Sequence, residues 1–207
     1  HKPFQNATIR PLIMSSVLDK RATQKKIRRM NVFRSLHDRI IEKGYARTTL
    51  EDIARGADMT PSHLLYYFDG KEDVLEQYFQ FVSERFLDQV QSLLDRPPSN
   101  QLKEFTEIWF KSGSSTKEEI GFMLECFGAA VNNKILHTIK AKFEKDCKAV
   151  LGKILSKSNK VAPIRENKDS SQATYSLMIG LRSSVYFDDI ELDEARRLFL
   201  RAVERLN

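Results

Sequence analysis

The first part of the chain carries apolar residues at three- and four-residue spacing, which is the period of one face of an α-helix. Lysines and arginines fill many of the positions between them. The pattern predicts an amphipathic helix from Arg21 to Gly44, with its apolar face against a core. The residues of that face are Ile27, Met30, Phe33, Leu36 and Ile40.

Two much shorter helices are predicted after this one. Thr48 or Thr49 can cap a helix from Leu50 to Ala57, because a threonine hydroxyl can accept a hydrogen bond from a free N–H of the first turn. Glu51 and Asp52 place negative charge at the positive end of that helix. The helix is expected to be barely two turns long.

Residues 58–61 predict a tight turn and the start of a third helix. Asp58 can adopt the left-handed backbone conformation of such a turn. Thr60 can cap the helix, and Pro61 suits its first position, where no N–H is needed. This helix is expected to end near Tyr67.

Two short helices joined by a four-residue turn form a helix-turn-helix, in which the second helix can enter the major groove of DNA. On that second helix, Leu64 and Phe68 are expected to face inward. The side chains left to face a partner are those of Pro61, Ser62, His63, Leu65 and Tyr66. Similar pairs of helices occur in proteins that do not bind DNA, so the pattern alone leaves the function open.

Helical spacing continues to the end of the chain. Asp69 and Glu72 resemble a capping box that opens a long fourth helix, and Pro97 and Pro98 end it. The later helices are expected at Leu102–Phe110, Ile120–Val131, Ile135–Ile154, Gln172–Tyr186 and Leu192–Leu206. We therefore predict an all-α protein of about nine helices, in which a three-helix head precedes a helical body.

Two stretches between these helices are polar. Residues 111–116 predict a loop, whose Thr116 can form a capping box with Glu119 at the start of the next helix. The segment from Ser156 to Ser171 predicts a mobile polar connection. Between the two stretches, residues 120–131 are apolar on nearly every side, which indicates a helix buried centrally in the body.

Composition and charge agree with a helical protein and add a clue to its partner. The chain is 41% hydrophobic and 30% charged, with 8 Gly and 6 Pro, which suits helices better than disorder or sheet sandwiches. Residues 1–71 hold 14 Lys and Arg against 7 Asp and Glu, whereas residues 72–207 hold 20 against 21. A basic head on a neutral body suits binding to a polyanion, although a solvated basic helix would give the same charge.

Several other classes of protein are disfavoured. Cys126 and Cys147 lie far apart in helical apolar patterns, which predicts reduced, buried thiols without a disulfide or metal. The 4 His and 2 Cys show no metal-binding spacing, and no phosphate loop or nucleophile elbow occurs, so we expect neither enzyme activity nor a cofactor. No apolar run approaches the about 20 residues that span a membrane, and residues 1–14 contain no apolar segment of the kind that forms the core of a signal peptide. We expect a cytoplasmic protein without membrane contact.

The residues from Gly44 to Gln77, GYARTTLEDIARGADMTPSHLLYYFDGKEDVLEQ, resemble the DNA-binding signature of the TetR (tetracycline-repressor) family. Matching features are dense across residues 27–79. The resemblance implies a helix-turn-helix at about residues 49–68. It also implies three parts of the chain, which are an N-terminal extension at 1–20, a DNA-binding domain at 21–71, and an effector-binding and dimerisation domain at 72–207.

The resemblance further implies how this protein meets double-stranded DNA. A homodimer would place each head in a major groove of a near-palindromic operator and act as a repressor that a ligand releases. Ser62, His63 and Tyr66 would reach base edges, although His63 could equally be a spectator. The DNA-binding residues expected from the resemblance are Thr48, Thr49, Thr60, Pro61, Ser62, His63, Tyr66, Tyr67 and Lys71.

The roles of these residues differ. Thr48, Thr49 and Lys71 would contact phosphate at helix starts, although both threonines could serve as simple caps. Two positions depart from the family pattern, because Asp58 stands where Gly is common and Leu65 stands where Tyr is common. The DNA contacts of the family therefore cannot simply be copied to this chain.

The body is expected to hold an effector and to form the dimer. Bulky apolar side chains of the central helices would wall a ligand cavity and favour a small apolar or aromatic effector, although each of them could equally be plain core. These residues are Phe105, Trp109, Phe110, Phe122, Met123, Phe127, Phe143, Tyr175 and Met178. The last two helices resemble the family's four-helix dimer interface. The residues expected there are Leu181, Val185, Leu198, Phe199 and Ala202.

One alternative belongs to another functional class. A helical adaptor that binds protein partners could carry a basic head that is merely solvated. Such an adaptor would show little preference for DNA over other polyanions.

Overall fold

Every element is helical in the part of the chain that the computed structural model describes, which is residues 9–111, 117–158, 164–188 and 190–206. The all-α prediction is confirmed there. The elements are α1 (Ile9–Lys43), α2 (Leu50–Gly56), α3 (Pro61–Leu64), α4 (Lys71–Gln91), the 3-10 helix η1 (Ser92–Asp95), α5 (Pro98–Lys111), α6 (Lys117–Asn132), α7 (Lys134–Ser158), α8 (Ile164–Phe187) and α9 (Leu192–Leu206). None of these helices is long and apolar enough to cross a membrane.

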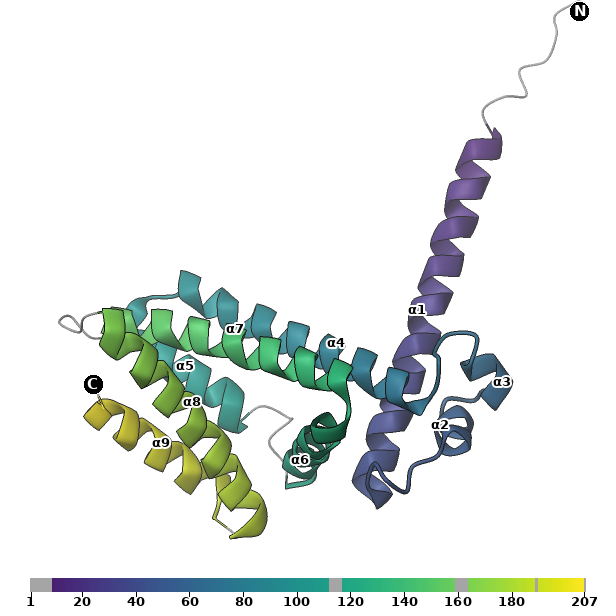
Figure 1. Ribbon diagram of the computed structural model, residues 1–207. Coiled ribbons are helices and arrows are strands. Elements are labelled where there is room, and N and C mark those ends of the chain that lie inside the picture. Colours follow the sequence, from purple (N-terminus) through teal and green to yellow (C-terminus); the bar gives the residue numbers. More distant parts are fainter. Residues whose placement is uncertain (1–8, 112–116, 159–163, 189, 207) are drawn as a thin grey trace, which may run out of the picture.

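The helices form a head and a body (Figure 1). In the head, α2 and α3 lie beside the C-terminal half of α1. Helix α4 leads away from the head and runs along α7, while α8 and α9 lie toward the far end of the body. Helix α6 lies between the two parts, because it contacts α1 on one side and α7 and α8 on the other.

Two hydrophobic cores hold this arrangement together. The head core joins α1–α4 to α6 and the start of α7, and its fully buried side chains include Leu36, Ile53, Leu64, Leu75 and Leu136. The body core includes Phe105, Phe110, Leu151, Ile154 and Phe199. Each buried side chain of this size contributes about 1.5–3 kcal/mol. Because the head core includes residues of α6, a shift of α6 acts directly on the head.

Several helix ends differ from the predictions. Helix α9 spans Leu192–Leu206 as predicted, but α1 begins at Ile9 and not at Arg21. A proline in the first turn, here Pro11, leaves a helix intact because that N–H has no intrahelical partner. The predicted connection at 156–171 is helical up to 158 and again from Ile164, since residues 164–171 contain neither Gly nor Pro. The predicted cap Thr116 lies outside the described residues.

The predicted capping box at the start of α4 is wrong. The N-cap is Gly70, whose φ of +141° favours glycine, and no side chain caps it. The helix begins at Lys71, so Asp73 and not Glu72 occupies its third position. The Asp73 carboxylate accepts a hydrogen bond from the Asp69 N–H at 2.9 Å. An acidic residue therefore does reach back over the helix start, one position later than predicted.

Candidate functional sites

Helix α2 begins with a reciprocal capping box. The Thr49 hydroxyl accepts a hydrogen bond from the Asp52 N–H at 3.2 Å, and the Asp52 carboxylate accepts one from the Thr49 N–H at 2.9 Å. The same carboxylate pairs with Lys43 at 2.5 Å and with Arg55 at 2.6 Å. The hydrogen bond from Lys43, followed by those from Thr49, holds the pKa of Asp52 well below its usual range. The resulting stability is present at neutral pH and is lost as acid protonates the carboxylate.

The two neighbouring threonines differ in exposure. Thr48 is only 1% exposed, and its hydroxyl donates a hydrogen bond to the Gly44 carbonyl at 2.9 Å, at the end of α1. Thr49 is exposed at the start of α2. A phosphate contact from either hydroxyl would need an existing hydrogen bond to open, because the Thr49 hydroxyl donates to the Asp52 carboxylate at 2.8 Å. The two positions therefore differ in exposure and not in the availability of the hydroxyl proton.

The turn between α2 and α3 has the predicted conformation. Asp58 has a φ of +55° and is the one residue other than glycine with a positive φ in the described part of the chain. Thr60 then caps α3, because its hydroxyl accepts a hydrogen bond from the His63 N–H at 3.2 Å. Pro61 is the first residue of the helix. All three predictions for this turn are confirmed.

Helix α3 is shorter than predicted, since it ends at Leu64 and not near Tyr67. Turns continue the segment, as the N–H groups of Tyr67 and Phe68 donate to the Leu64 carbonyl at 2.9 and 3.1 Å. Leu64 and Phe68 are 0% and 2% exposed, as predicted. These two side chains anchor the recognition segment, residues 61–68, to the head core.

The outer face of the recognition segment is rich in aromatic and polar groups. Tyr66 is 79% exposed, Leu65 is 49% exposed and Ser62 is also exposed. His63 and Tyr67 are half-buried, and their ring centres lie 5.5 Å apart. The Tyr66 ring contacts that of Tyr67, with ring centres 5.2 Å apart, and most of its surface stays open to solvent or to a partner.

Lys71 lies at the first position of α4. Its ammonium donates a hydrogen bond to the Tyr45 carbonyl at 3.2 Å and lies 4.3 Å from the centre of the Tyr45 ring. The positive charge of Lys71 therefore lies against Tyr45, in the segment that connects α1 to α2. Both this charge and the N-terminal end of the α4 dipole favour an anion nearby.

A cavity of 230 Å³ lies among α1 and α4–α8. Five of the nine predicted effector residues line it, which are Trp109, Phe122, Met123, Phe127 and Phe143. The other four do not line it and are buried in the body core, which are Phe105, Phe110, Tyr175 and Met178. The remaining apolar walls come from Phe79, Val82 and Phe86 of α4. The structure thus brings together about half of the predicted effector set.

This cavity also has a polar lining that was not predicted from the sequence. His37, Tyr78, Glu119 and Arg182 all border it. Arg182 follows Met178 by four residues on α8, and this helical spacing places it on the same buried face. A charged residue within an apolar stripe was the signal that could have found it.

Three of these polar groups form a chain of hydrogen bonds. His37 Nε2 lies 2.8 Å from a Glu119 carboxylate oxygen, and the Tyr78 hydroxyl lies 2.9 Å from His37 Nδ1. Since a carboxylate only accepts, Nε2–H donates to Glu119, and in the neutral ring Nδ1 accepts from Tyr78. Burial raises the pKa of Tyr78, so its hydroxyl keeps its proton. The chain connects α4, the head helix α1 and the body helix α6.

Arg182 is the buried cation of the cavity. The residue is 7% exposed, and its guanidinium carbon lies 4.7 Å from the centre of the Trp109 ring. Burial lowers the pKa of Arg182 to about 10, while the charge of Glu119 acts in the opposite direction. A positive charge is therefore held beside aromatic walls, where water contributes little to its stabilisation.

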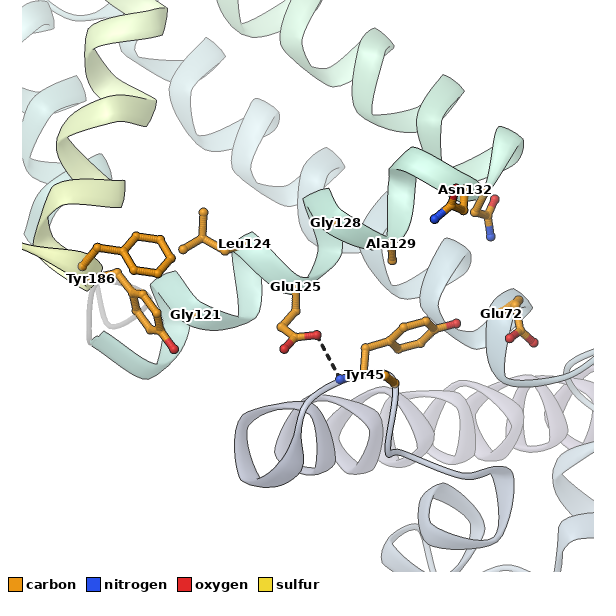
Figure 2. Close-up of a pocket in the computed structure, with 12 residues that line it drawn as sticks. Tyr45, Glu72, Gly121, Leu124, Glu125, Gly128, Ala129, Asn132 and Tyr186 are labelled. Carbon is orange, nitrogen blue, oxygen red and sulfur yellow. Dashed lines mark hydrogen bonds between the residues drawn. The ribbon is translucent and has the colours of Figure 1, made fainter.

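A larger groove of 760 Å³ lies at the junction of head and body (Figure 2). Gly121 and Gly128 of α6, Tyr45 of the head and Tyr186 of α8 are among its lining residues. The Tyr45 N–H donates a hydrogen bond to the Glu125 carboxylate at 3.1 Å, which ties head to body. None of the nine predicted effector residues lines this groove, so the smaller aromatic cavity is the better match to the predicted site.

The five residues predicted for the dimer interface divide between the inside and the outside of one chain. Val185 and Phe199 are 6% and 0% exposed and belong to the body core. Leu181 and Ala202 are half-buried, and Leu198 is 39% exposed. Since Leu198 and Ala202 lie four residues apart on α9, they share the face that remains open.

Residues 38–78 match the family model of bacterial regulatory proteins, tetR family. No match is found among curated protein sequences. The family match covers the end of α1, the whole helix-turn-helix and the first part of α4.

Solved structures share the overall fold at low sequence identity. A TetR transcription regulator from Haloarcula marismortui ATCC 43049 has a TM-score of 0.76 at 17% identity, over 86% of this chain and 97% of that chain. The fatty acid degradation regulator FadR from Bacillus halodurans has a TM-score of 0.71 at 20% identity, over 86% and 94%. The SmeT–triclosan complex has a TM-score of 0.69 at 17% identity, over 85% and 89%.

Proposed function

The chain belongs to the TetR family of bacterial regulatory proteins, with a DNA-binding helix-turn-helix, and on that premise we propose that it is a homodimeric repressor. Each head binds one half of a near-palindromic operator, and a small, largely apolar effector releases the dimer. Residues 21–71 form the DNA-binding domain, and residues 72–207 bind the effector and form the dimer. The protein acts by binding and not by catalysis, in the cytoplasm.

The observation that carries this proposal is the outer face of the recognition segment. Leu64 and Phe68 fix the segment from behind, while Ser62 and Tyr66 stay exposed in front. A tyrosine hydroxyl and a serine hydroxyl can both hydrogen-bond to base edges or phosphates. The excess positive charge of residues 1–71 supplies the attraction to phosphate that such a surface needs.

The cavity supports the effector part of the proposal. It is walled mostly by aromatic side chains and lies between the head helix α1 and the body helices. A small molecule that fills it would alter the packing of α6, which contacts both parts. The triclosan complex among similar folds shows that such a fold can hold a small aromatic molecule.

Selection of a palindrome from random duplexes tests the proposal directly. The purified protein should bind the selected duplex at least about 10³-fold more tightly than a scrambled one of the same length. Equal binding to selected and scrambled DNA would contradict the regulator and favour the helical adaptor.

Substitutions in the head should separate base reading from phosphate binding. Lys71→Ala is expected to weaken binding to all duplexes about equally and to reduce the salt dependence, because it removes one positive charge that would pair with a DNA phosphate. His63→Ala is expected to change the sequence preference, by about 1–3 kcal/mol at one base pair. Fluorescence anisotropy over a salt series, with thermal melting of each variant, measures both effects. An unchanged preference in His63→Ala would remove His63 from the base-reading set.

The open face of α9 should determine the dimer. Sedimentation at micromolar concentration is expected to give twice the 24.0 kDa of one chain. Leu198→Glu should give monomers, because it puts a charge at the centre of an apolar contact. Leu65→Glu changes an exposed leucine of the head and is the matched control, which should remain dimeric. A dimeric Leu198→Glu protein would place the interface elsewhere.

A further inference from the structure

The recognition segment carries an apolar side chain on its outer face. Its exposed residues are Ser62, Leu65 and Tyr66, and Leu65 is 49% exposed. In the described part of the chain, Leu65 belongs to neither hydrophobic core and is not among the partly buried side chains that pack against them. Its side chain therefore contributes little to folding and is free to contact a partner.

The backbone fixes the position of this side chain. Leu65 is the C-cap of α3 with helical backbone angles, and its N–H donates a hydrogen bond to the Pro61 carbonyl at 2.9 Å. Leu64 and Phe68, on either side of it in the sequence, are buried in the head core. Helix α3 lies on the side of α1 that is away from the body helices (Figure 1). Leu65 is therefore held at the outer surface of the head before any DNA is bound.

We propose that Leu65 recognises a thymine of the operator through its C5-methyl group, which lies in the major groove. The inference rests on the DNA-binding regulator proposed above and names one base that each head recognises. Tyrosine is common at this position in the family. A leucine there replaces a hydroxyl by an apolar surface, and so changes the group on DNA that it can recognise.

The chemistry of the major groove leaves one apolar target for a leucine. The base edges carry hydrogen-bond donors and acceptors, and the methyl group of thymine is the apolar group among them. A leucine placed against a phosphate or a polar base edge displaces water without replacing its hydrogen bonds, which costs free energy. Against the methyl group, apolar surface leaves water on both sides, and this is favourable. Leu65 therefore prefers thymine over cytosine, which lacks the methyl group.

The neighbouring side chains supply the polar contacts that a leucine lacks. Ser62 lies three residues before Leu65, a spacing that places the two side chains on adjacent parts of a helical surface. The Tyr66 side chain is 79% exposed, and its hydroxyl can bind a phosphate or a base edge. Contacts of these two hydroxyls orient the segment on DNA, which brings Leu65 to a fixed place in the groove.

Deoxyuridine tests the contact, because it differs from thymidine only in lacking this methyl group. In the selected duplex, each thymine is replaced in turn by deoxyuridine in both half-sites, and fluorescence anisotropy measures the dissociation constant. At least one position should respond, with binding weakened about fourfold for each half-site, the value of burying one methyl group. A selected half-site without thymine, or one in which no replacement weakens binding, would overturn the proposal.

Variants of Leu65 identify the side chain that contacts the methyl group. Leu65→Ala should bind the thymine duplex more weakly and should no longer distinguish it from the deoxyuridine duplex. Leu65→Met keeps a long apolar side chain and should keep most of the discrimination. Ile135→Ala truncates a 60% exposed isoleucine of α7 and is the control, which should keep both the affinity and the discrimination.

Circular dichroism melting confirms that each variant is folded. A folded Leu65→Ala protein that distinguishes the two duplexes as well as the unaltered protein would overturn the assignment of Leu65. Weaker binding to both duplexes by the same factor has that meaning too, because it indicates a contact to the sugar or backbone and not to the methyl group.

5-Methylcytosine separates the methyl group from the rest of the base pair. Exchanging the responsive T·A pair for C·G changes the hydrogen-bonding groups as well as the methyl group, whereas 5-methylcytosine restores the methyl group alone. The unaltered protein should bind the methylated C·G duplex about fourfold more tightly for each half-site than the unmethylated one. Leu65→Ala should bind the two equally, and equal binding by the unaltered protein would overturn the proposal.

This inference and the proposed function fail in different ways. Selective binding of a palindrome without any response to the methyl group leaves the regulator intact and overturns the recognition of thymine by Leu65. Equal binding to selected and scrambled duplexes contradicts the regulator itself, and the inference that rests on it.

Discussion

Replacing Phe33 with alanine is expected to lower the free energy of unfolding by about 3–5 kcal/mol, the usual cost of truncating a buried phenylalanine. Phe33 is 4% exposed in the head core. Its ring centre lies 5.8 Å from that of Phe68, 5.3 Å from Tyr78 and 5.7 Å from Phe81. The substitution would leave a cavity among these rings, which the surrounding helices can fill only in part.

DNA binding should fall with stability in this variant. Phe68 ends the recognition segment and rests on Phe33, so the segment loses support from behind. Urea denaturation measures the stability, and anisotropy with the selected duplex measures binding. Ile27→Ala is the control on the same helix, because Ile27 is 47% exposed and its truncation should cost within about 0.5 kcal/mol. Equal costs for the two variants would contradict the assignment of Phe33 to the head core.

Gly56→Ala is expected to destabilise the head by about 1–3 kcal/mol, although alanine is the better helix former. A Cβ atom at Gly56 would lie 2.2 Å from Ser35 Oγ and 3.1 Å from Ser35 Cβ. The Ser35 hydroxyl cannot turn away freely, because it is buried and donates a hydrogen bond to the Ile53 carbonyl at 2.8 Å. Overpacking therefore outweighs helix propensity at this position.

Two further variants test the cause of that loss. Gly128→Ala in α6 is the matched control, since a Cβ there meets nothing within 4 Å, and it should stabilise the protein by up to about 1 kcal/mol. Adding Ser35→Ala to Gly56→Ala should recover part of the stability, because it removes the closest atom. A Gly56→Ala protein as stable as the original in thermal melting would show that α1 and α2 can separate without cost.

The local features of the head could be predicted because they depend on residues close together in the sequence. The cap at Thr60, the proline at the first position of α3 and the left-handed Asp58 all act within one turn of backbone. The start of α4 could not be predicted in the same way. The Asp69–Glu72 spacing predicted one capping register there, but the helix begins one residue later, after Gly70, which places Asp73 at the third position.

The two faces of α9 show where periodicity stops being informative. Apolar spacing predicted the helix and its ends, but both Phe199 and Leu198 fit an apolar stripe. Packing against α5 and α8 buries Phe199 completely and leaves Leu198 39% exposed. The orientation of α9 relative to its neighbours decides which of its faces is buried, and this orientation depends on how all the helices of the body pack.

The helical fold of the described residues, the helix-turn-helix and the basic head follow from the amino-acid sequence, because helix period and caps depend on residues within a few positions of one another. The polar side of the 230 Å³ cavity depends on how distant helices pack. His37 and Glu119 are 82 residues apart in the chain, yet they lie within hydrogen-bond distance beside Arg182. No periodicity relates positions on different helices, since their distance is set by the packing of the two hydrophobic cores.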